Sequence, residues 1–205
     1  MHPMNDIAGT LRVLVAEYDR AARETLVELL RSLGHLVVAE VETGDEAVRR
    51  AVESAPDAVL LDVHMPGGAS GLDAAHQITE QAPGIAIVLF TGDANLSLSA
   101  DDALRSHAVA LLPKPVPTAT LDATLRLAVA RTRELLDARK DAKQAREQLE
   151  ARKLIERAKG ILMRRTGSSE QEAYRIMQRT SQDKSVPMVN IAKAVLDSEP
   201  GLKAS

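Results

Sequence analysis

The 205-residue sequence carries a formal net charge of −3 and 45% hydrophobic residues, which indicates a soluble globular chain with room for two domains. It has no cysteine, which excludes disulfides and thiolate metal sites. Because it has only one Phe, two Tyr and no Trp, its core has to be built from aliphatic residues. No apolar run approaches the roughly 18 residues of a membrane span, and residues 1–10 lack the features of a signal peptide, so we expect a cytoplasmic protein without membrane contact.

Five short apolar runs alternate with helical patterns in the first half of the chain. The runs are continuous, as expected for strands buried on both faces, and cover residues 11–17, 36–41, 57–63, 85–92 and 109–114. Between them lie amphipathic stretches of about 10–14 residues. One ends at Gly34, and another opens with Thr43 and Glu46 at capping-box spacing. The alternation predicts an α/β fold with a doubly wound, five-stranded parallel sheet.

One long helix is predicted from Thr118 to Arg165, because this stretch contains no Pro and no Gly before Gly160. Apolar residues recur along it at heptad spacing: Leu121, Ala128, Leu135, Ala142 and Leu149. The second seam of the heptad is poor, with Thr124, Arg131, Ala138 and Ala145. A coiled coil that pairs two chains and a solvated linker helix are therefore both open interpretations.

Two shorter helices are predicted after Gly167. Ser168 with Gln171 is expected to cap the first, and Ser185 with Pro187 to start the second. Together with an apolar stripe on the long helix they predict a small all-α, three-helix C-terminal domain. The expected domain boundaries are residues 1–117, a linker helix over residues 118–150, and residues 151–205.

Four polar residues end or follow the predicted strands: Glu17, Asp62, Thr91 and Lys114. The carboxyl ends of parallel strands share one edge of a sheet, so we expect these side chains to converge there. A carboxylate can attack phosphorus to give an aspartyl phosphate, and an ammonium and a hydroxyl stabilise the incoming negative charge. The acids can also hold Mg²⁺. The set predicts phosphoryl transfer to Asp62 rather than hydrolysis, for which the nearest histidine, His64, has no evident partner.

In this order and spacing, the segments VLVAE, LLDVHMP, FTG and LPKP resemble the receiver domain of two-component response regulators, over about residues 10–130. The resemblance implies a flavodoxin-like fold in which Asp62 accepts a phosphoryl group from a sensor histidine kinase. It also implies that Mg²⁺ binds near Glu17, Asp62 and the backbone carbonyl of His64, and that Thr91 and Lys114 contact the phosphoryl group. The expected protein is a phosphorylated regulator of a two-component system and not an enzyme.

The sequence departs from the receiver pattern at three places. The family usually has two acids in a row after the first strand, whereas Glu17 is followed here by Tyr18, with Asp19 one position late as an alternative metal ligand. Leu111 stands in the region where an aromatic switch residue is usual, and the loop over residues 65–71 is one residue longer than usual. An atypical receiver with weak Mg²⁺ affinity is therefore an open interpretation.

The tail resembles the ANTAR domain of antitermination regulators. The resemblance rests on ERAKGILM at residues 156–163, QEAY at residues 171–174 and IAKAVL at residues 191–196, and covers about residues 150–198. It implies binding of paired RNA hairpins in leader transcripts, which lets polymerase read through a terminator. Charge agrees with a polyanionic partner, because residues 151–205 hold 11 basic and 6 acidic residues.

The candidate RNA-binding residues are basic side chains and one aromatic side chain of the tail: Arg157, Lys159, Arg164, Arg165, Tyr174, Arg175 and Arg179. Cationic side chains supply salt-dependent affinity for phosphates, and an aromatic ring can stack on an unpaired base. Packing of Tyr174 into the helical core against Ile161 or Leu196 is the slightly favoured alternative. Gly160 is costly inside a helix and suggests that another helix or RNA approaches closely there.

Three functions follow from these observations. The first is a phosphorylation-controlled regulator that binds RNA hairpins, as a homodimer through the linker helix, to cause transcription antitermination. The second is a DNA-binding response regulator. The sequence argues against it, because we find no helix rich in Arg, Asn and Gln that suits a major groove. The third is an atypical receiver that acts through protein–protein contacts alone.

Overall fold

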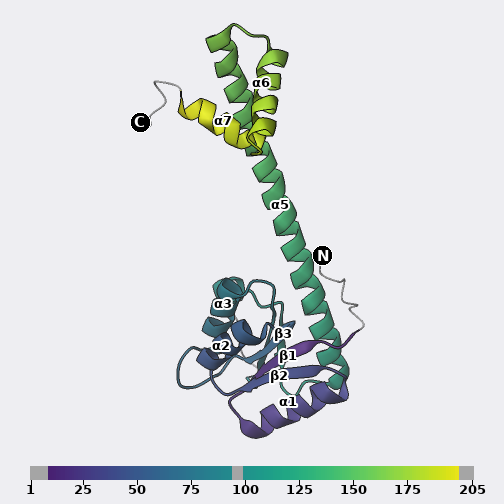
Figure 1. Ribbon diagram of the computed structural model, residues 1–205. Coiled ribbons are helices and arrows are strands. Elements are labelled where there is room, and N and C mark those ends of the chain that lie inside the picture. The colour runs from purple at the N-terminus through teal and green to yellow at the C-terminus, as the bar shows by residue number, and fades with distance from the viewer. Residues whose placement is uncertain (1–8, 94–98, 199–205) are drawn as a thin grey trace. The chain divides into compact units, whose positions relative to one another are not determined.

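The computed structural model describes residues 9–93 and 99–198, which form two compact units that divide between Asp137 and Ala138 (Figure 1). The first unit contains a five-stranded parallel sheet, and the second is built from helices. In the described part of the chain, no helix is both long and apolar enough to cross a lipid bilayer.

The five predicted strands are all present and pair in parallel in the order β2-β1-β3-β4-β5. Their bounds are β1 Arg12–Ala16, β2 Leu36–Val41, β3 Ala58–Asp62, β4 Ala86–Thr91 and β5 Ala110–Pro113. The strand β3 is central, with Leu60 in register with Val15 on one side and Val88 on the other. Because β1 ends at Ala16 and β5 at Pro113, Glu17 and Lys114 are the first residues beyond their strands.

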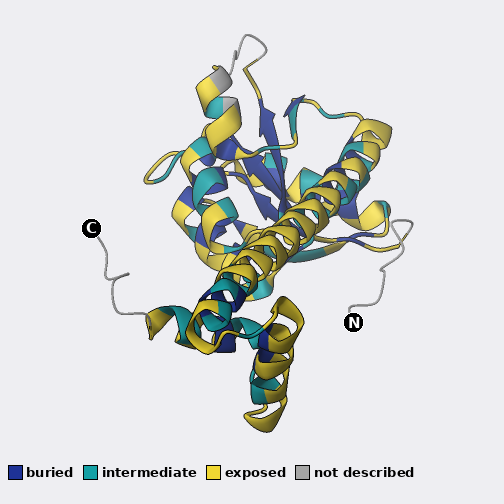
Figure 2. Ribbon diagram, turned by 90° about the horizontal axis from the view of Figure 1, so that it is seen from above, coloured by how far each residue is buried: buried dark blue, intermediate teal, exposed yellow. Residues whose placement is uncertain are grey.

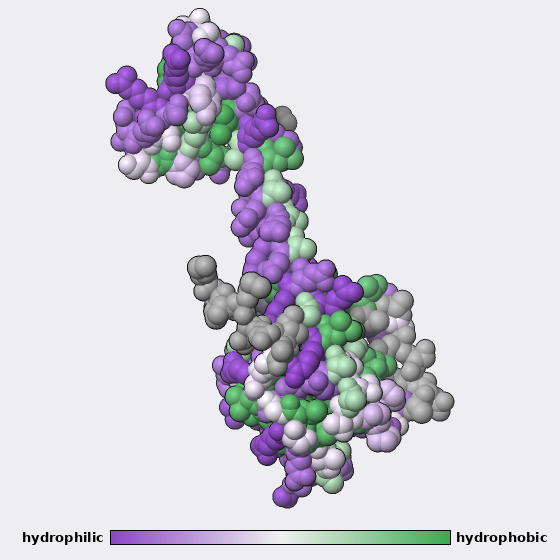
Figure 3. Space-filling model, turned by 90° about the vertical axis from the view of Figure 1, so that its right-hand side faces the viewer, coloured by the Kyte–Doolittle hydropathy of each residue, from purple (hydrophilic) through white to green (hydrophobic). Residues whose placement is uncertain are grey.

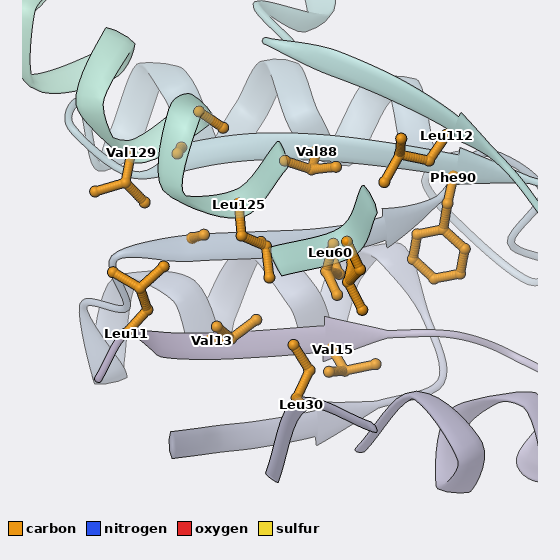
Figure 4. Packing of buried hydrophobic residues seen from close by; sticks show 14 of the residues in the cluster. Leu11, Val13, Val15, Leu30, Leu60, Val88, Phe90, Leu112, Leu125 and Val129 are labelled. Carbon is orange, nitrogen blue, oxygen red and sulfur yellow. The ribbon is translucent and has the colours of Figure 1, made fainter. Parts of the chain in front are cut away.

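Helices cover both faces of the sheet (Figure 1). Their bounds are α1 Arg20–Ser32, α2 Gly44–Ser54, α3 Gly71–Gln81, α4 Ala100–Ser106 and α5 Thr118–Thr166. On one face, α1 and the first turns of α5 pack on aliphatic residues such as Val13, Leu60 and Val88, with Phe90 at one end of the cluster (Figure 4). On the other face, α2 and α3 pack on a second aliphatic cluster. The core is thus aliphatic on both sides, as composition required.

Local sequence signals set most helix ends as predicted. Gly34 follows the end of α1 with φ +82, a left-handed conformation that glycine adopts without strain. The Thr43 side chain accepts the N–H of Glu46 and caps α2. The prediction for α4 was too long, because this helix covers only Ala100–Ser106, between its cap at Ser99 and a left-handed His107.

The helix α5 supplies core residues to both units, as the uninterrupted sequence predicted. Leu121, Leu125, Ala128 and Val129 are buried in the first unit, and Ala158 and Ile161 in the second. Between these two stretches, residues 137–150 are all exposed, which Figure 2 shows as a mostly yellow helix. This stretch is largely hydrophilic, with a strip of more hydrophobic residues along it (Figure 3).

Buried polar contacts tie the start of α5 to the sheet. The N–H of Leu11 donates to Nδ1 of His35 (3.3 Å), and Nε2 of the same ring is hydrogen-bonded to Asp122 Oδ1 (2.9 Å). Arg126 donates to both oxygens of Asp122, and this hydrogen bond, aided by that from His35, lowers the pKa of the Asp122 carboxyl. The first turns of α5 are therefore held by charge as well as by apolar packing.

A second polar contact lies about three turns beyond Asp122 on α5, in the first unit. Arg133 Nη2 donates to Asp57 Oδ1 (3.0 Å), while Asp57 Oδ2 accepts the backbone N–H of Arg12 (2.9 Å). Asp57 precedes β3 and Arg12 begins β1, so this contact holds α5 at the amino ends of β1 and β3.

The second unit is a three-helix core formed by the end of α5 with α6 (Glu170–Asp183) and α7 (Met188–Asp197). The buried residues that cluster at its centre are Ala158, Met177, Ile191 and Ala192. The predicted cap of α6 was off by one residue, because Ser169 and Glu172 form a complete capping box. The cap of α7 is Pro187, without a side-chain hydrogen bond.

Burial along α5 predicts a strong contrast between two leucines two positions apart. Leu125 is 0% exposed and Leu127 is 59% exposed. Leu125→Ala leaves a cavity in the first unit and should lower its free energy of unfolding by about 2–5 kcal/mol. Leu127→Ala is the matched control and should change it by less than about 0.5 kcal/mol. Urea unfolding of the full chain, followed by circular dichroism, measures both; equal effects would contradict the described packing of α5.

Candidate functional site

The candidate site lies at the carboxyl edge of the sheet, where three neighbouring strands bring polar residues together. Asp62 ends the central strand β3, Glu17 follows β1 and Thr91 ends β4. Lys114 follows β5, the strand beyond β4. All four residues stand where the sequence predicted them, because the register of a parallel sheet aligns the ends of its strands.

The Lys114 ammonium joins the two carboxylates of the site. Its Nζ donates to Asp62 Oδ2 at 2.6 Å and also to Glu17 Oε2. Both acids are buried in the protein, with 2% of Glu17 and 6% of Asp62 exposed. Buried carboxylates are tolerated only when a counter-charge and hydrogen bonds replace the lost water. Lys114 supplies that charge to both.

The remaining oxygens of the carboxylates accept backbone hydrogen bonds. Asp62 Oδ1 accepts the N–H of His64, and Glu17 Oε1 accepts the N–H of Asp19, both at 2.9 Å. The Thr91 hydroxyl accepts the N–H of Asp93 at 3.0 Å, which leaves its own proton available for donation. The side chains of Asp62, Glu17 and Thr91 are thus oriented by the backbone of the loops that follow their strands.

Two opposing effects act on the Lys114 ammonium. Desolvation by burial lowers the pKa of Lys114, but the hydrogen bonds and charges of Asp62 and Glu17 outweigh it and raise this pKa above its ordinary value of 10.5. The ammonium also lies 4.5 Å from the centre of the Phe90 ring, a cation–π distance. Lys114 is therefore fully charged at neutral pH.

The donor set of the site fits a magnesium ion, because Mg²⁺ is typically held by one or two carboxylates together with water and phosphate oxygens. Glu17 and Asp62 provide the carboxylates. The Asp19 side chain instead caps α1 by accepting the N–H of Ala22, and Tyr18 points outward with 58% of its surface exposed. In the described ranges, no three His, Cys, Asp or Glu side chains gather into a metal-binding group.

Sequence reasoning missed two residues of the site. Phe90, the one phenylalanine of the chain, was not connected with Lys114 because their contact joins two different strands. Arg23 lies on the buried face of α1 with Val27 and Leu30, where the helical spacing calls for an apolar residue. An arginine at such a position is itself a signal, since buried charges are rare unless paired.

In the second unit, most of the basic residues singled out in the sequence are exposed. They lie on α5 and α6: Arg157, Arg164, Arg165, Arg175 and Arg179. Lys159 differs, because its side chain is only 10% exposed and its Nζ bonds Glu156 and Glu170, both at 2.8 Å. The hydrogen bonds that Lys159 donates to Glu156 and to Glu170 raise the pKa of its ammonium. Its charge is thus engaged within the helical unit.

Two interpretations of the tail are corrected by the structure. Tyr174 does not pack into the core, because 43% of it is exposed on α6, where the inward positions are taken by Ala173 and Met177. Gly160 is not a site of close helix approach, since an added Cβ would meet only the end of the Arg164 side chain, at 3.7 Å.

Comparison with known families matches both units. The response regulator receiver domain matches residues 13–126, and the ANTAR domain matches residues 143–196. The transcriptional regulatory protein PdtaR of Mycobacterium tuberculosis is 37% identical over 195 residues, which cover 94% of this chain and 93% of that protein.

Solved receiver domains resemble the first unit in structure. The receiver domain of the sensor histidine kinase PA1611 from Pseudomonas aeruginosa has a TM-score of 0.53 and 27% identity, covering 60% of this chain and 99% of that one; its active-site cleft coordinates a magnesium ion. The receiver domain of a modulated diguanylate cyclase from Desulfovibrio desulfuricans also has a TM-score of 0.53, with 28% identity over 60% of this chain and 97% of that one.

The raised pKa of Lys114 predicts a stability change at alkaline pH. Because the pKa in the folded state exceeds the ordinary 10.5, the stabilisation from the ammonium is complete below pH 10.5 and is lost as pH rises through the folded-state pKa. Lys114→Met should lower the free energy of unfolding at pH 8 by roughly 2 kcal/mol. We expect its difference in Tm from the original protein to shrink between pH 10 and pH 12.

Thermal melts across this pH range provide the measurement, with Lys143→Met as the control. Lys143 is exposed, and its ammonium lies 4.0 Å from Glu147 on the same helix. A difference between Lys114→Met and the original protein that stays constant from pH 8 to pH 12 would contradict the ion-pair geometry.

Proposed function

The chain belongs to the response regulators that join a receiver domain to an ANTAR domain, and we propose that phosphorylation of Asp62 controls its binding to RNA. The proposed phosphoryl donor is a sensor histidine kinase, and the proposed targets are RNA hairpins in leader transcripts. Binding lets polymerase pass a terminator, so the protein acts as a regulator rather than as an enzyme. The observation that carries this proposal is the placement of Asp62 beside Lys114 at the edge of the sheet.

The geometry supports Asp62 as the phosphoryl acceptor. Its carboxylate ends the central strand, next to an ammonium and beside a strand that ends in a hydroxyl. When a carboxylate oxygen attacks phosphorus, the bond from phosphorus to the histidine nitrogen of the donor breaks and that nitrogen keeps the electron pair. The acyl phosphate carries more negative charge than the carboxylate did. Lys114 and the Thr91 hydroxyl are placed to stabilise this added charge.

Magnesium is the proposed cofactor, held by Glu17, Asp62 and the backbone carbonyl of His64. When bound, it neutralises phosphate oxygens during transfer. The chain orients this donor set through the backbone hydrogen bonds to Glu17 Oε1 and Asp62 Oδ1. With Asp19 engaged as a helix cap and Tyr18 exposed, only two carboxylates contribute, and we expect weak Mg²⁺ affinity.

The second unit is the proposed RNA-binding unit. Arg175 and Arg179 are exposed one turn apart on α6, so they share a face of the helix, and Tyr174 is exposed beside them. Guanidinium groups contact phosphates, and an exposed ring can stack on a splayed base. Arg157, Arg164 and Arg165 are the corresponding candidates on α5. We omit Lys159 from the phosphate-binding set because its ammonium is paired within the unit.

Two chains acting together are part of the proposal. Each chain carries one helical unit, whereas paired hairpins present two binding sites. Leu135 and Leu149 are exposed on α5, with alanines between them at seam positions, which suits weak pairing of two helices. Tethering two units raises the apparent affinity through effective concentration, without new contacts.

Loss of the acceptor should abolish phosphorylation. Asp62→Asn keeps the size of the side chain but removes the nucleophilic carboxylate, so labelling by a sensor kinase or by acetyl phosphate should disappear. Asp93→Asn is the matched control, because Asp93 is an exposed acid two residues beyond β4, and its labelling should persist. Circular dichroism checks that both variants fold. Label retained on Asp62→Asn would refute the assignment.

Loss of two arginines of α6 should weaken the binding of all RNA sequences to a similar extent. Arg175→Ala with Arg179→Ala should reduce the affinity for hairpin RNA and flatten the dependence of log affinity on log salt by about one per lost phosphate contact. Arg20→Ala with Arg31→Ala removes the same charge from α1 and should leave both quantities unchanged. Filter binding over a salt series provides the measurement.

Stoichiometry completes this test. Light scattering of the phosphorylated protein with a two-hairpin RNA should give two chains per RNA. A stable complex with one chain would contradict the dimer, and tighter binding of duplex DNA than of hairpin RNA would favour a DNA-binding regulator instead.

A further inference from the structure

Arg23 is a buried charged residue that the proposed chemistry does not use. It lies in α1 on the face that packs on the sheet, and only 8% of it is exposed. A guanidinium in such a place requires hydrogen-bond partners that compensate for lost water. The hydrogen-bond partners of Arg23 therefore show which segments of the chain it holds in place.

All described partners of the Arg23 guanidinium belong to two loops at the carboxyl edge of the sheet. Nη1 donates to the backbone carbonyls of Glu17 (2.7 Å) and Tyr18 (3.4 Å). Nη2 donates to Glu42 Oε1 (2.7 Å), directly after β2. The planar fork of an arginine suits such a bridge, because its donors diverge in fixed directions.

These contacts complete the support of the Glu17 backbone. The N–H of Glu17 donates to the carbonyl of Val41 at 3.1 Å, which holds one side of the residue to β2. Its carbonyl is held by Arg23 on the other side. Arg23 is in turn anchored by Glu42, one residue beyond Val41. Glu17 is therefore clamped from both sides to the same neighbouring strand end, while its carboxylate faces Lys114.

We propose that Arg23 is a positioning residue of the phosphoryl-transfer site, which fixes the Glu17 backbone so that its carboxylate meets Lys114 and Asp62. The inference rests on the proposed function, because it assigns Arg23 to the site that receives the phosphoryl group and Mg²⁺. Without the guanidinium, the carbonyls of Glu17 and Tyr18 lose their donor, and the segment between β1 and α1 gains freedom. The Glu17 carboxylate would then sample positions away from Asp62.

A purely structural ion pair between α1 and β2 is the competing explanation, and it makes a different prediction. It would lower the stability of Arg23 variants but leave the geometry of Glu17 unchanged. The test therefore needs readouts at Glu17 itself. Amide exchange without metal reports the backbone, through the N–H groups of Glu17 and Asp19, and calorimetric titration with Mg²⁺ reports the carboxylates.

We expect Arg23→Ala in the full chain to weaken Mg²⁺ binding about tenfold or more, since loss of an outer partner of a metal ligand typically has this effect. Exchange of the Glu17 and Asp19 amides should accelerate. Arg23→Lys should be intermediate, because a single ammonium can hold one carbonyl but cannot bridge to Glu42 as well. Arg20→Ala is the control: Arg20 is exposed, pairs with Glu24 on its own helix, and should behave as the original chain.

Glu42→Ala keeps the test decisive if Arg23→Ala fails to fold, because Glu42 is largely exposed and its removal releases only the outer anchor of Arg23. Glu42→Ala should also weaken Mg²⁺ binding and accelerate amide exchange at Glu17 and Asp19, but by less than Arg23→Ala does. Unchanged amide exchange at Glu17 and Asp19, with unchanged Mg²⁺ affinity, in a folded Arg23→Ala or Glu42→Ala chain would overturn the inference. Failure of acetyl phosphate to label Asp62 in the original chain would instead refute the proposed function, while the exchange measurement without metal still decides the role of Arg23.

Discussion

One ammonium between two buried carboxylates is the interaction on which the edge of the sheet depends. Glu17 and Asp62 stand at the ends of adjacent strands, so the parallel register forces their charges together. Two such acids repel each other out of water, and only a cation between them makes the arrangement stable at neutral pH. Lys114 provides that cation from two strands beyond Asp62. The ammonium that stabilises the two carboxylates also places a positive charge beside Asp62.

Most of the fold was predictable because its signals are local and repeated. Continuous apolar runs identified all five strands, and the run without Pro, and without Gly before Gly160, identified α5 to within one residue of its end at Thr166. The residues at the site were predictable for the same reason, since a parallel sheet brings every strand end to one edge. Glu17, Asp62, Thr91 and Lys114 needed no knowledge of side-chain packing to be placed there.

What escaped prediction depends on contacts between distant residues or on choices between neighbours. The bridge made by Arg23 joins α1 to two loops, and no sequence period encodes its direction. Ser168 and Ser169 are each followed three residues later by a side chain suited to a capping box, and only the structure selects Ser169. Whether Tyr174 faces inward depends on which face of α6 packs against α5 and α7, and that face carries Ala173 and Met177.

The path from the acceptor to the start of α5 is short in this chain. Lys114 bonds Asp62, and only Pro115, Val116 and Pro117 separate it from the first residue of α5. Two prolines fix φ in this connection, and the carbonyl of Pro117 accepts the N–H of Leu121. A change in the partners of Lys114 when Asp62 gains a phosphoryl group would therefore act on a stiff segment at the start of α5. Because α5 contributes core residues to both units, that segment lies on the continuous helix that belongs to both of them.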